Sequence, residues 1–302
     1  MTRLEMRSRH PLAIRSSGSA LYKAKLAGML CVVGFALVRG FGLPAEKFAS
    51  GSTDFKPSNS EGQESRTPVV VELFTSEGCS DCPPADKLLS WLAKSQPVKD
   101  VEIIPLSEHV DYWNHLGWSD PYSSSALSER QRDYSNSLRS EVYTPQMIVD
   151  GTVEFVGSDA DKALRAISSE LHTPKVTVNI QPISPASAWE RNSVPFSVRV
   201  QKLTLLDAKA KGLVFIAVTE DNLQSSVVRG ENSGRTLAHT AVVRELKKIG
   251  ELDARSDAVF VAEPTIEIST KWKRQDLRAI AFVEGQGSHR ILGAAETRIP
   301  SL

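Results

Sequence analysis

The chain has 302 residues, of which 41% are hydrophobic and 24% are charged. This composition can bury an ordinary core, and the length has room for one large domain or two smaller ones. The formal net charge is zero, but from residue 40 onward the chain holds 29 basic and 35 acidic residues. A mildly acidic body without a basic stripe argues against nucleic-acid binding.

The first 45 residues predict an export segment. Residues 1–39 hold seven Lys and Arg and one acid, Glu5, and residues 26–38 carry no charge. A basic start followed by a short apolar run is typical of a secretory signal, whereas a membrane span needs about 20 apolar residues. We therefore expect a secreted or periplasmic protein, with an uncleaved N-terminal anchor as the alternative. Residues 46–67 are polar and predict a flexible linker.

The number and position of the cysteines limit the roles that they can have. The chain has three, and Cys31 lies inside the predicted export segment. The other two, Cys79 and Cys82, lie in the stretch VVVELFTSEGCSDCPP at 69–84. A small secreted domain held by disulfides has more cysteines, spread along its chain, and a bridge across two residues restricts the unfolded chain little. The pair is therefore expected to be a redox centre or part of a metal site.

Strand and helix patterns alternate between residues 68 and 173. Apolar runs predict strands at 69–74, 101–106, 144–149 and 153–156, and apolar stripes with helical spacing predict helices at 83–94, 123–138 and 158–172. Pro83 and Pro84 suit a first helical turn, and Ser158 with Asp161 suits a capping box. A strand that leads into CxxC at the start of a helix is typical of a thioredoxin-like redox motif. Zinc knuckles also use CxxC, but the chain has no second CxxC and no HxxxH.

Beyond Pro174 the pattern changes to strands with few helix signals. Seven segments alternate or run apolar, namely VTVNI, PFSVRV, GLVFIAVTE, HTAVVREL, AVFVAEPTIEI, LRAIAFVE and HRILGAAE. This number of strands predicts an antiparallel β-sandwich at 174–302.

Four separated segments carry a resemblance to one family: VVELFTSEGCSDCPPAD, HVDYWNHLGWSDPYSS, YTPQMIVDG and RGENSGRTLAHTAVVR. With them the chain resembles the secreted, thioredoxin-like proteins of domain-of-unknown-function family 1223, over nearly everything after residue 66. The resemblance implies an α/β thioredoxin-like domain at 68–173, followed by an all-β, sandwich-like domain at 174–302. It implies no established activity.

The likeness to thioredoxin-like proteins suggests roles for four residues. Cys79 is expected to be the nucleophile, because a helix N-terminus lowers the pKa of a thiol, and Cys82 the resolving thiol. Thr144–Pro145 matches the proline that such proteins hold in cis opposite the cysteines. Glu72, a charge within an apolar strand, matches the buried acid that accepts the proton of the resolving thiol. The alternative for Glu72 is a strand-end glutamate that reaches solvent.

Other polar residues leave alternatives open. Asp81, between the cysteines, either opposes thiolate formation or caps the helix. His109 follows the second strand, at the sheet edge that carries the cysteines, and could be a base, a metal ligand or a hydrogen-bonded structural residue. Arg235 and His239 lie in the segment GENSGRTLAH of the β-rich part, where they are candidates for contact with the first domain.

Three functions follow from these residues. The favoured one is a cell-envelope thiol–disulfide oxidoreductase that acts on protein thiols and disulfides and needs no cofactor. The second is a copper-binding envelope protein, in which Cys79, Cys82 and His109 offer a soft site for Cu(I). The third is a non-catalytic scaffold with a thioredoxin fold. Contact with a membrane is expected only through an uncleaved N-terminal anchor.

Overall fold

The structure, a computed structural model, describes residues 66–183, 192–201, 211–253 and 259–300. These residues belong to one compact unit, Ser60–Leu302. The predicted export segment and nearly all of the predicted linker lie outside the described part of the chain. Among the helices in the described ranges, none is both long enough and apolar enough to span a membrane.

The elements predicted between residues 68 and 173 form close to their predicted bounds. They are β1 (Thr67–Thr75), α1 (Pro83–Ser95), β2 (Val101–His109), η1 (Asn114–Leu116), α2 (Ser125–Leu138), β3 (Gln146–Val149), β4 (Val153–Val156), α3 (Ala160–Ser169) and η2 (Glu170–His172), where η marks a 3-10 turn. Pro83 and Pro84 occupy the first turn of α1, as predicted. The predicted capping box of α3 is wrong, because Asp159 is the N-cap and its carboxylate accepts from Lys162 N at 3.0 Å.

The segment after Pro174 forms strands, as its pattern predicts. They are β5 (Val178–Pro182), β6 (Ser193–Val200), β7 (Lys211–Glu220), β8 (Leu223–Ser226), β9 (Thr236–His239), β10 (Val242–Asp253), β11 (Phe260–Ala262), β12 (Thr265–Glu267), β13 (Leu277–Gly285) and β14 (Ile291–Arg298), with a 3-10 turn η4 (Arg274–Asp276) before β13.

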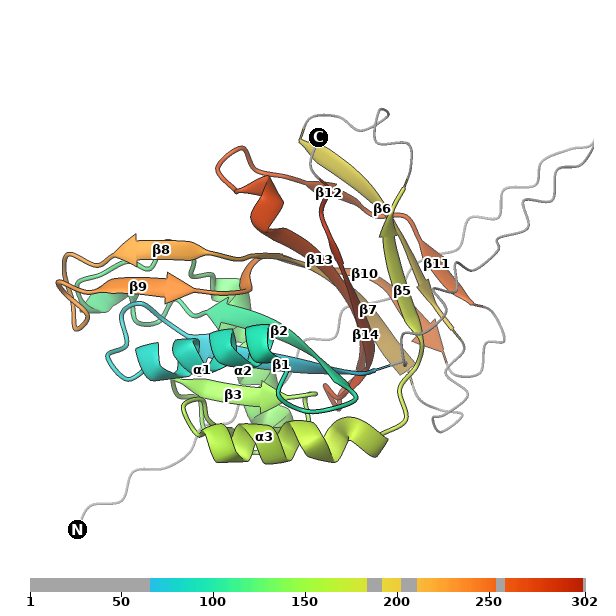
Figure 1. Ribbon diagram of the computed structural model, residues 1–302, viewed down its shortest axis with the longest axis horizontal. Helices are drawn as coiled ribbons and strands as arrows, with labels where there is room; N and C mark the ends of the chain where they lie inside the picture. The colour runs from blue at the N-terminus through green and yellow to red at the C-terminus, as the bar shows by residue number, and fades with distance from the viewer. Residues whose placement is uncertain (1–65, 184–191, 202–210, 254–258, 301–302) are drawn as a thin grey trace, which may run out of the picture. The chain divides into compact units, whose positions relative to one another are not determined.

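The expected pair of folds, an α/β thioredoxin-like domain followed by an all-β, sandwich-like domain, is wrong. The described residues are mainly β, with three α-helices, and eight strands form one mixed sheet in the order β14-β13-β7-β10-β2-β1-β3-β4. Strands from both sides of residue 173 therefore share a sheet (Figure 1). They join where β10 runs parallel to β2, with Val242 opposite Ser107, and Ser107 N donates to Ala241 O at 2.8 Å.

The physical reason for this error lies in the edge of β2. A hydrophobic pattern shows which residues of a strand are buried, but not which strand lies beside it. β1 pairs with one edge of β2, and the other edge would leave unpaired N–H and C=O groups. β10 meets that edge at one residue pair, Val242 opposite Ser107. One signal was available, since the near-continuous apolar run LRAIAFVE of β13 is typical of a strand covered on both faces.

A smaller sheet packs against the part of the large sheet that follows residue 210. β6 pairs with β11 and β12, and also with β5. Side chains of the small sheet such as Phe196 and Val198 share a buried core with Ile216 of β7 and Ala281 of β13. This core is separate from those that surround β1.

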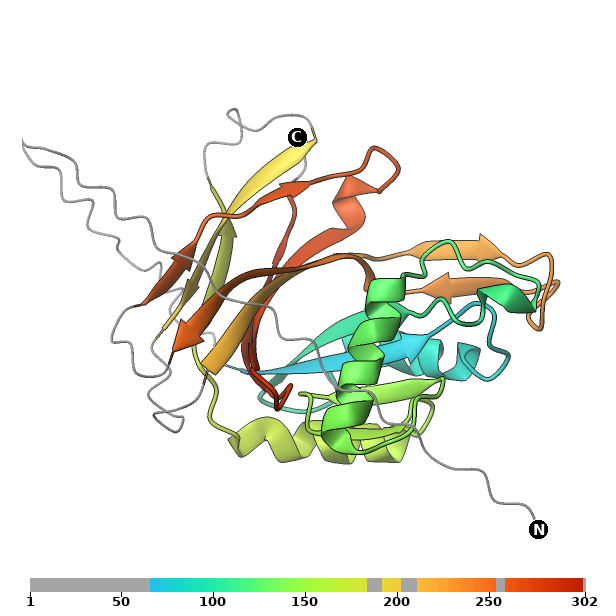
Figure 2. The same ribbon diagram turned by 180° about the vertical axis from the view of Figure 1, so that it is seen from behind.

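The helices cover opposite faces of the sheet around β1 (Figures 1 and 2). Val69, Val71 and Leu73 share a core with α1 and α3. Phe74 and Ile148 share another with Tyr134 of α2. Because successive residues of a strand face opposite sides, Glu72 lies on the α2 face of β1, away from α1.

Glu72 belongs to a buried charge cluster around Arg130 of α2. Arg130 Nε donates to Glu72 Oε1 at 2.7 Å, and Arg130 Nη1 donates to Glu284 Oε2 at 2.8 Å. Tyr134 OH also donates to Glu72. Glu108 lies 3.4 Å from Arg130 Nε, and burial, followed by the nearby Glu72, raises the pKa of Glu108 well above its ordinary value. The Arg130 guanidinium thus pairs with two buried carboxylates of this face, and its contact with Glu72 explains a glutamate within an apolar strand.

Arg130→Met should therefore destabilise the protein strongly. The variant leaves Glu72 and Glu284 buried without their cation, a change that typically costs about 3–5 kcal/mol. The measurement is the free energy of unfolding from urea denaturation at pH 7. Arg132→Met is the matched control, because the Arg132 side chain, on the same helix, is 51% exposed. Equal stabilities of the two variants would contradict this account of the cluster.

Candidate functional site

The cysteine loop connects β1 to α1 and is closed by a disulfide between Cys79 and Cys82. Cys79 N donates to Ser76 O at 3.2 Å, and Cys82 N donates to Cys79 O at 3.3 Å. Cys82 is the N-cap residue of α1 and is fully buried, while Cys79 is 2% exposed. Asp81 is exposed, and the cap makes no side-chain hydrogen bond, so the predicted capping role of Asp81 is wrong.

A cis-proline lies beside the cysteines. The Thr144–Pro145 peptide bond is cis, which confirms the geometry expected there. Cys79 Sγ lies 3.9 Å from Thr144 O. Trp113 Nε1 donates to Thr144 Oγ1 at 2.8 Å, and a Cβ added to Gly78 would lie 3.0 Å from Trp113 Cβ. Trp113, in the segment after β2, therefore packs on the cysteine loop. It also helps to position residues 143–145, the proline loop.

The loop between β8 and β9, in the second half of the chain, makes hydrogen bonds to the cysteine loop. Asn232, fully buried, donates through Nδ2 to Glu77 O and to Cys79 O, each at 2.8 Å. Ser80 N donates to Glu231 Oε2 at 3.1 Å. Arg235 Nη1 in turn donates to Asn232 Oδ1 at 2.9 Å and orients the amide. The β8–β9 hairpin lies beside α1 (Figure 1), and this contact gives Arg235 the structural role that sequence patterns left open.

A buried polar cluster lies next to the loop. Glu77 Oε1 lies 3.1 Å from His239 Nε2, and Glu77 Oε2 accepts from Trp118 Nε1 at 2.8 Å. His109 Nδ1 lies 2.7 Å from Asp120 Oδ2, which also accepts from Glu77 N at 2.8 Å. The rings of His109 and His239 meet edge to face at 4.8 Å. His109 thus has a charged hydrogen-bond partner, and His239, from the second half of the chain, belongs to the same cluster.

His109 and Asp120 each shift the pKa of the other toward its charged form. Burial by itself would lower the pKa of His109, but the Asp120 carboxylate, and then Asp86 and Glu77, raise it above its ordinary value. Burial by itself would raise the pKa of Asp120, but His109 and two backbone N–H groups hold it below its ordinary value. These directions favour a charged His109–Asp120 pair.

Asp86 is the acid nearest to Cys82 along α1. The two residues are four apart on the helix and so lie on the same face, and Asp86 N donates to Cys82 O at 3.1 Å. Thr75 Oγ1 donates to Asp86 Oδ1 at 2.9 Å, and Asp86 Oδ2 lies 3.9 Å from His239 Nδ1. Burial raises the pKa of Asp86 above its ordinary value.

A cleft of about 470 Å³ between α1 and β9 is lined by Pro83, Asp86 and other residues of both elements.

The structure does not bring Glu72 to the cysteines. Glu72 is buried, so the alternative that it reaches solvent is wrong. Its carboxylate pairs with Arg130 on the α2 face, while Cys82 begins α1 on the other face. The four-residue spacing from Cys82 to Asp86 was the sequence signal that could have identified the nearer acid.

The predicted copper ligands are engaged in other ways. The sulfurs of Cys79 and Cys82 are bonded to each other, and His109 Nδ1 faces Asp120. Within the part of the chain that the structure describes, no group of three or more His, Cys, Asp and Glu side chains is arranged to hold a metal ion.

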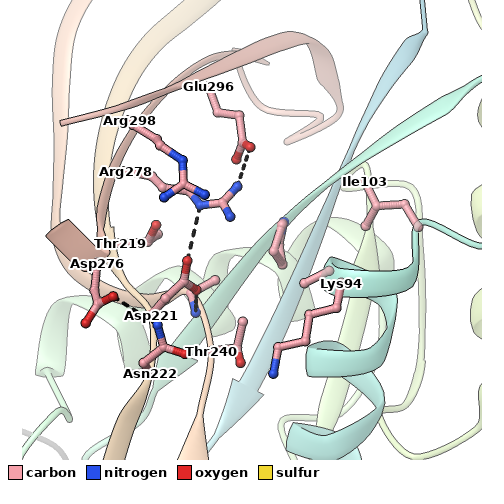
Figure 3. A pocket seen from close by; sticks show the side chains of 13 residues that line it. Lys94, Ile103, Thr219, Asp221, Asn222, Thr240, Asp276, Arg278, Glu296 and Arg298 are labelled. Carbon is pink, nitrogen blue, oxygen red and sulfur yellow. Dashed lines mark hydrogen bonds and ion pairs between the residues drawn. The ribbon is translucent and has the colours of Figure 1, made fainter. Parts of the chain in front are cut away.

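A charged pocket of about 330 Å³ lies between α1, β2 and the strands β7, β13 and β14 (Figure 3). Arg278 donates to Asp221 at 3.2 Å and to Glu296 at 2.5 Å. Asn222 Nδ2 donates to Asp276 at 2.9 Å. These three acids are thus engaged by other side chains of the pocket wall. We therefore place the candidate site at the cysteine loop, where the disulfide lies next to a cluster of buried acids and imidazoles.

The chain is similar to one family and to several solved structures, including the two that follow. The family described as "Protein of unknown function (DUF1223)" matches residues 70–284. A crystal structure of an Agrobacterium tumefaciens protein is 23% identical with a TM-score of 0.58, over 80% of this chain and 98% of that one. The structure of HBP35 of Porphyromonas gingivalis is 15% identical with a TM-score of 0.57, over 78% of this chain and 76% of that one. At these identities the likeness concerns the fold alone. No curated protein matches the chain.

Asn232→Asp should loosen the cysteine loop. The substitution keeps the shape of the side chain but replaces the N–H donors with an oxygen that faces two carbonyl oxygens. Leaving buried groups without partners costs about 2–3 kcal/mol, measured as the free energy of unfolding in urea. Asn179→Asp, at an exposed position of β5, is the matched control. A loss of stability no larger than that of the control would contradict the role of Asn232 in holding the cysteine loop.

The His109–Asp120 pair predicts a pH dependence of stability. Because the folded-state pKa of His109 is raised, its contribution is complete below the ordinary value of 6.5 and is lost as the pH rises through the folded value. The free energy of unfolding should therefore fall above pH 6.5, and by less in His109→Gln. Some fall should remain, since a hydrogen bond to Glu284 also raises the pKa of His289. His115→Gln, at an exposed position, should keep the wild-type profile; an unchanged profile in His109→Gln would refute the pair's role.

Proposed function

The chain belongs to the DUF1223 family of proteins of unknown function, and from its own geometry we propose that it is a thiol–disulfide oxidoreductase. Cys79 and Cys82 are the redox pair. The observation that carries this proposal is the Cys79–Cys82 disulfide at the start of α1, with Cys79 Sγ 3.9 Å from the carbonyl that precedes cis-Pro145. A strand that leads into CxxC and a helix is the local arrangement that thioredoxin-like oxidoreductases use.

Cys79 is the better candidate for the nucleophile. It has a small exposed area, whereas Cys82 has none. Both thiols would lie at the positive end of the α1 dipole, which favours a thiolate. The proline loop lies against Cys79, where a substrate must approach.

The exchange balances with two electrons. In the reduced protein, the Cys79 thiolate attacks one sulfur of a substrate disulfide, forms a mixed disulfide and releases the first substrate thiolate. The Cys82 thiolate then attacks Cys79 Sγ and releases the second. The pair is oxidised to the disulfide, and the substrate is reduced to two thiols; the reverse sequence oxidises a dithiol.

Asp86 takes the proton-accepting role in this proposal. Cys82 must lose its proton before it attacks, and an acid in place to receive it must be deprotonated and close. Asp86 lies on the same face of α1 as Cys82, and its raised pKa suits proton transfer nearer to neutral pH. Thr75 Oγ1 donates to Asp86 and holds it in place, and His239 Nδ1 lies 3.9 Å from its other carboxylate oxygen.

We also propose that the protein acts outside the cytosol. The support is the basic start and the uncharged run of residues 26–38, which suit an export signal. A disulfide persists in such an oxidising compartment.

Substitution of each cysteine should separate the two steps. Wild-type protein, with dithiothreitol as the reductant, should accelerate reduction of a disulfide-bonded peptide, and Cys79→Ser should abolish this activity. Cys82→Ser, reduced beforehand and mixed with the peptide after the dithiothreitol is removed, should accumulate a mixed disulfide between Cys79 and the peptide, because the resolving attack is lost. Mass spectrometry under non-reducing conditions detects the adduct. A Cys82→Ser protein that forms none, or a Cys79→Ser protein with full activity, would contradict the assignment.

A further inference from the structure

We infer that the groove between β4 and α3 docks an extended polypeptide substrate and leads it to Cys79. This inference rests on the proposed function for the reaction that follows docking. The groove has a volume of about 660 Å³ and is lined by residues of the proline loop, the open edge strand and the helix: Tyr143, Thr152, Val153, Glu154, Phe155, Val156, Lys162, Arg165, Ala166 and Ser169.

β4 ends the eight-stranded sheet, so its outer edge is open among the described strands. Five consecutive residues, 152–156, line the groove. Side chains alternate between the faces of a strand, so a groove that touches all five runs along the edge itself. A chain in this groove is placed to add a strand to the sheet.

The backbone groups of β4 fit that role. Gly157 N donates to Pro145 O at 2.8 Å, and Phe155 lies opposite Met147 in the same antiparallel register. Since hydrogen-bonded positions alternate in an antiparallel pair, the backbone of Phe155 and Gly157 turns toward β3. The N–H groups of Glu154 and Val156 therefore turn outward, into the groove.

The side chains of the groove indicate the chemistry of the peptide. Val153 is 40% exposed and Val156 is 48% exposed, which is unusual for the edge of a sheet that must not aggregate. The Glu154 carboxylate is engaged by Tyr143 OH and by Gln146 Nε2. Arg165 is exposed at the rim. We expect a peptide with apolar side chains and an acidic residue that pairs with Arg165.

The lining of the groove is next to the redox site along the chain. Tyr143 lines it, and the next residue supplies the carbonyl that lies 3.9 Å from Cys79 Sγ. At the other side of this junction, a Cβ on Gly157 would lie 3.2 Å from Pro145 Cβ and 3.2 Å from Ala85 Cβ. The carboxyl end of β4 thus packs on the proline loop and on the first turn of α1, so a docked strand leads toward the cysteines.

Binding of a peptide without cysteine tests this surface without redox chemistry. The probe is a fluorescein-labelled peptide of about ten residues, alternating valine and serine with two central glutamates. Fluorescence anisotropy with the oxidised, full-length protein should show saturable binding. Val156→Asp should weaken binding at least about tenfold, while Val261→Asp, a matched change at a valine that is 47% exposed on β11, should not.

Charge reversal supplies a second variant. Arg165→Glu should weaken binding of the glutamate peptide and strengthen binding of a peptide with two central lysines. Equal affinities of Val156→Asp and Val261→Asp, or no response to Arg165→Glu, would overturn the inference. So would a wild-type dimer in sedimentation that Val156→Asp dissociates, since a second copy would then occupy the edge.

The outcome is distinguishable from failure of the proposed function. If the peptide binds as expected but Cys79 and Cys82 show no reversible redox couple, the docking surface stands and the oxidoreductase does not. If the couple is present and the peptide does not bind at this edge, the reverse holds.

Discussion

The parallel pairing of β10 with β2 is the contact on which the site depends. It is short, with Val242 opposite Ser107 and a hydrogen bond from Ser107 N to Ala241 O. Residue 241 follows β9 by two positions. Fixing β10 at the edge of β2 therefore fixes the β8–β9 hairpin beside α1, and it brings His239 and Asn232 to a loop more than 150 residues earlier in the chain.

The site is consequently a product of both halves of the chain. The first half supplies the disulfide, the cis-proline and Asp86, and the second supplies the amide that holds the loop and the imidazole beside Asp86. The buried acids on the two faces of β1 are compensated separately, Glu72 by Arg130 and Asp120 by His109.

Much of the local structure was predictable from the sequence, because strand and helix patterns record which side chains are buried. The β1–CxxC–α1 order is one such confirmed feature. The cis bond before Pro145 is also confirmed, but it was expected from the likeness to thioredoxin-like proteins and not from a burial pattern. Strand order was not predictable, because the apolar runs of β7, β10 and β13 do not specify their neighbours. Glu72 is buried, as its expected role required. Its assignment to the cysteines was wrong because the pattern did not show which face of β1 it lies on, or that Arg130, 58 residues away, pairs with it.

An equilibrium redox titration of Cys79 and Cys82 in the full-length protein tests the central claim most directly. Thiols are trapped at each ratio of reduced to oxidised dithiothreitol and counted by mass spectrometry, with circular dichroism on the same samples. The account predicts a reversible two-electron transition of the pair while the fold is retained. Reduction that occurs only together with unfolding would show a structural cross-link instead and would contradict the account.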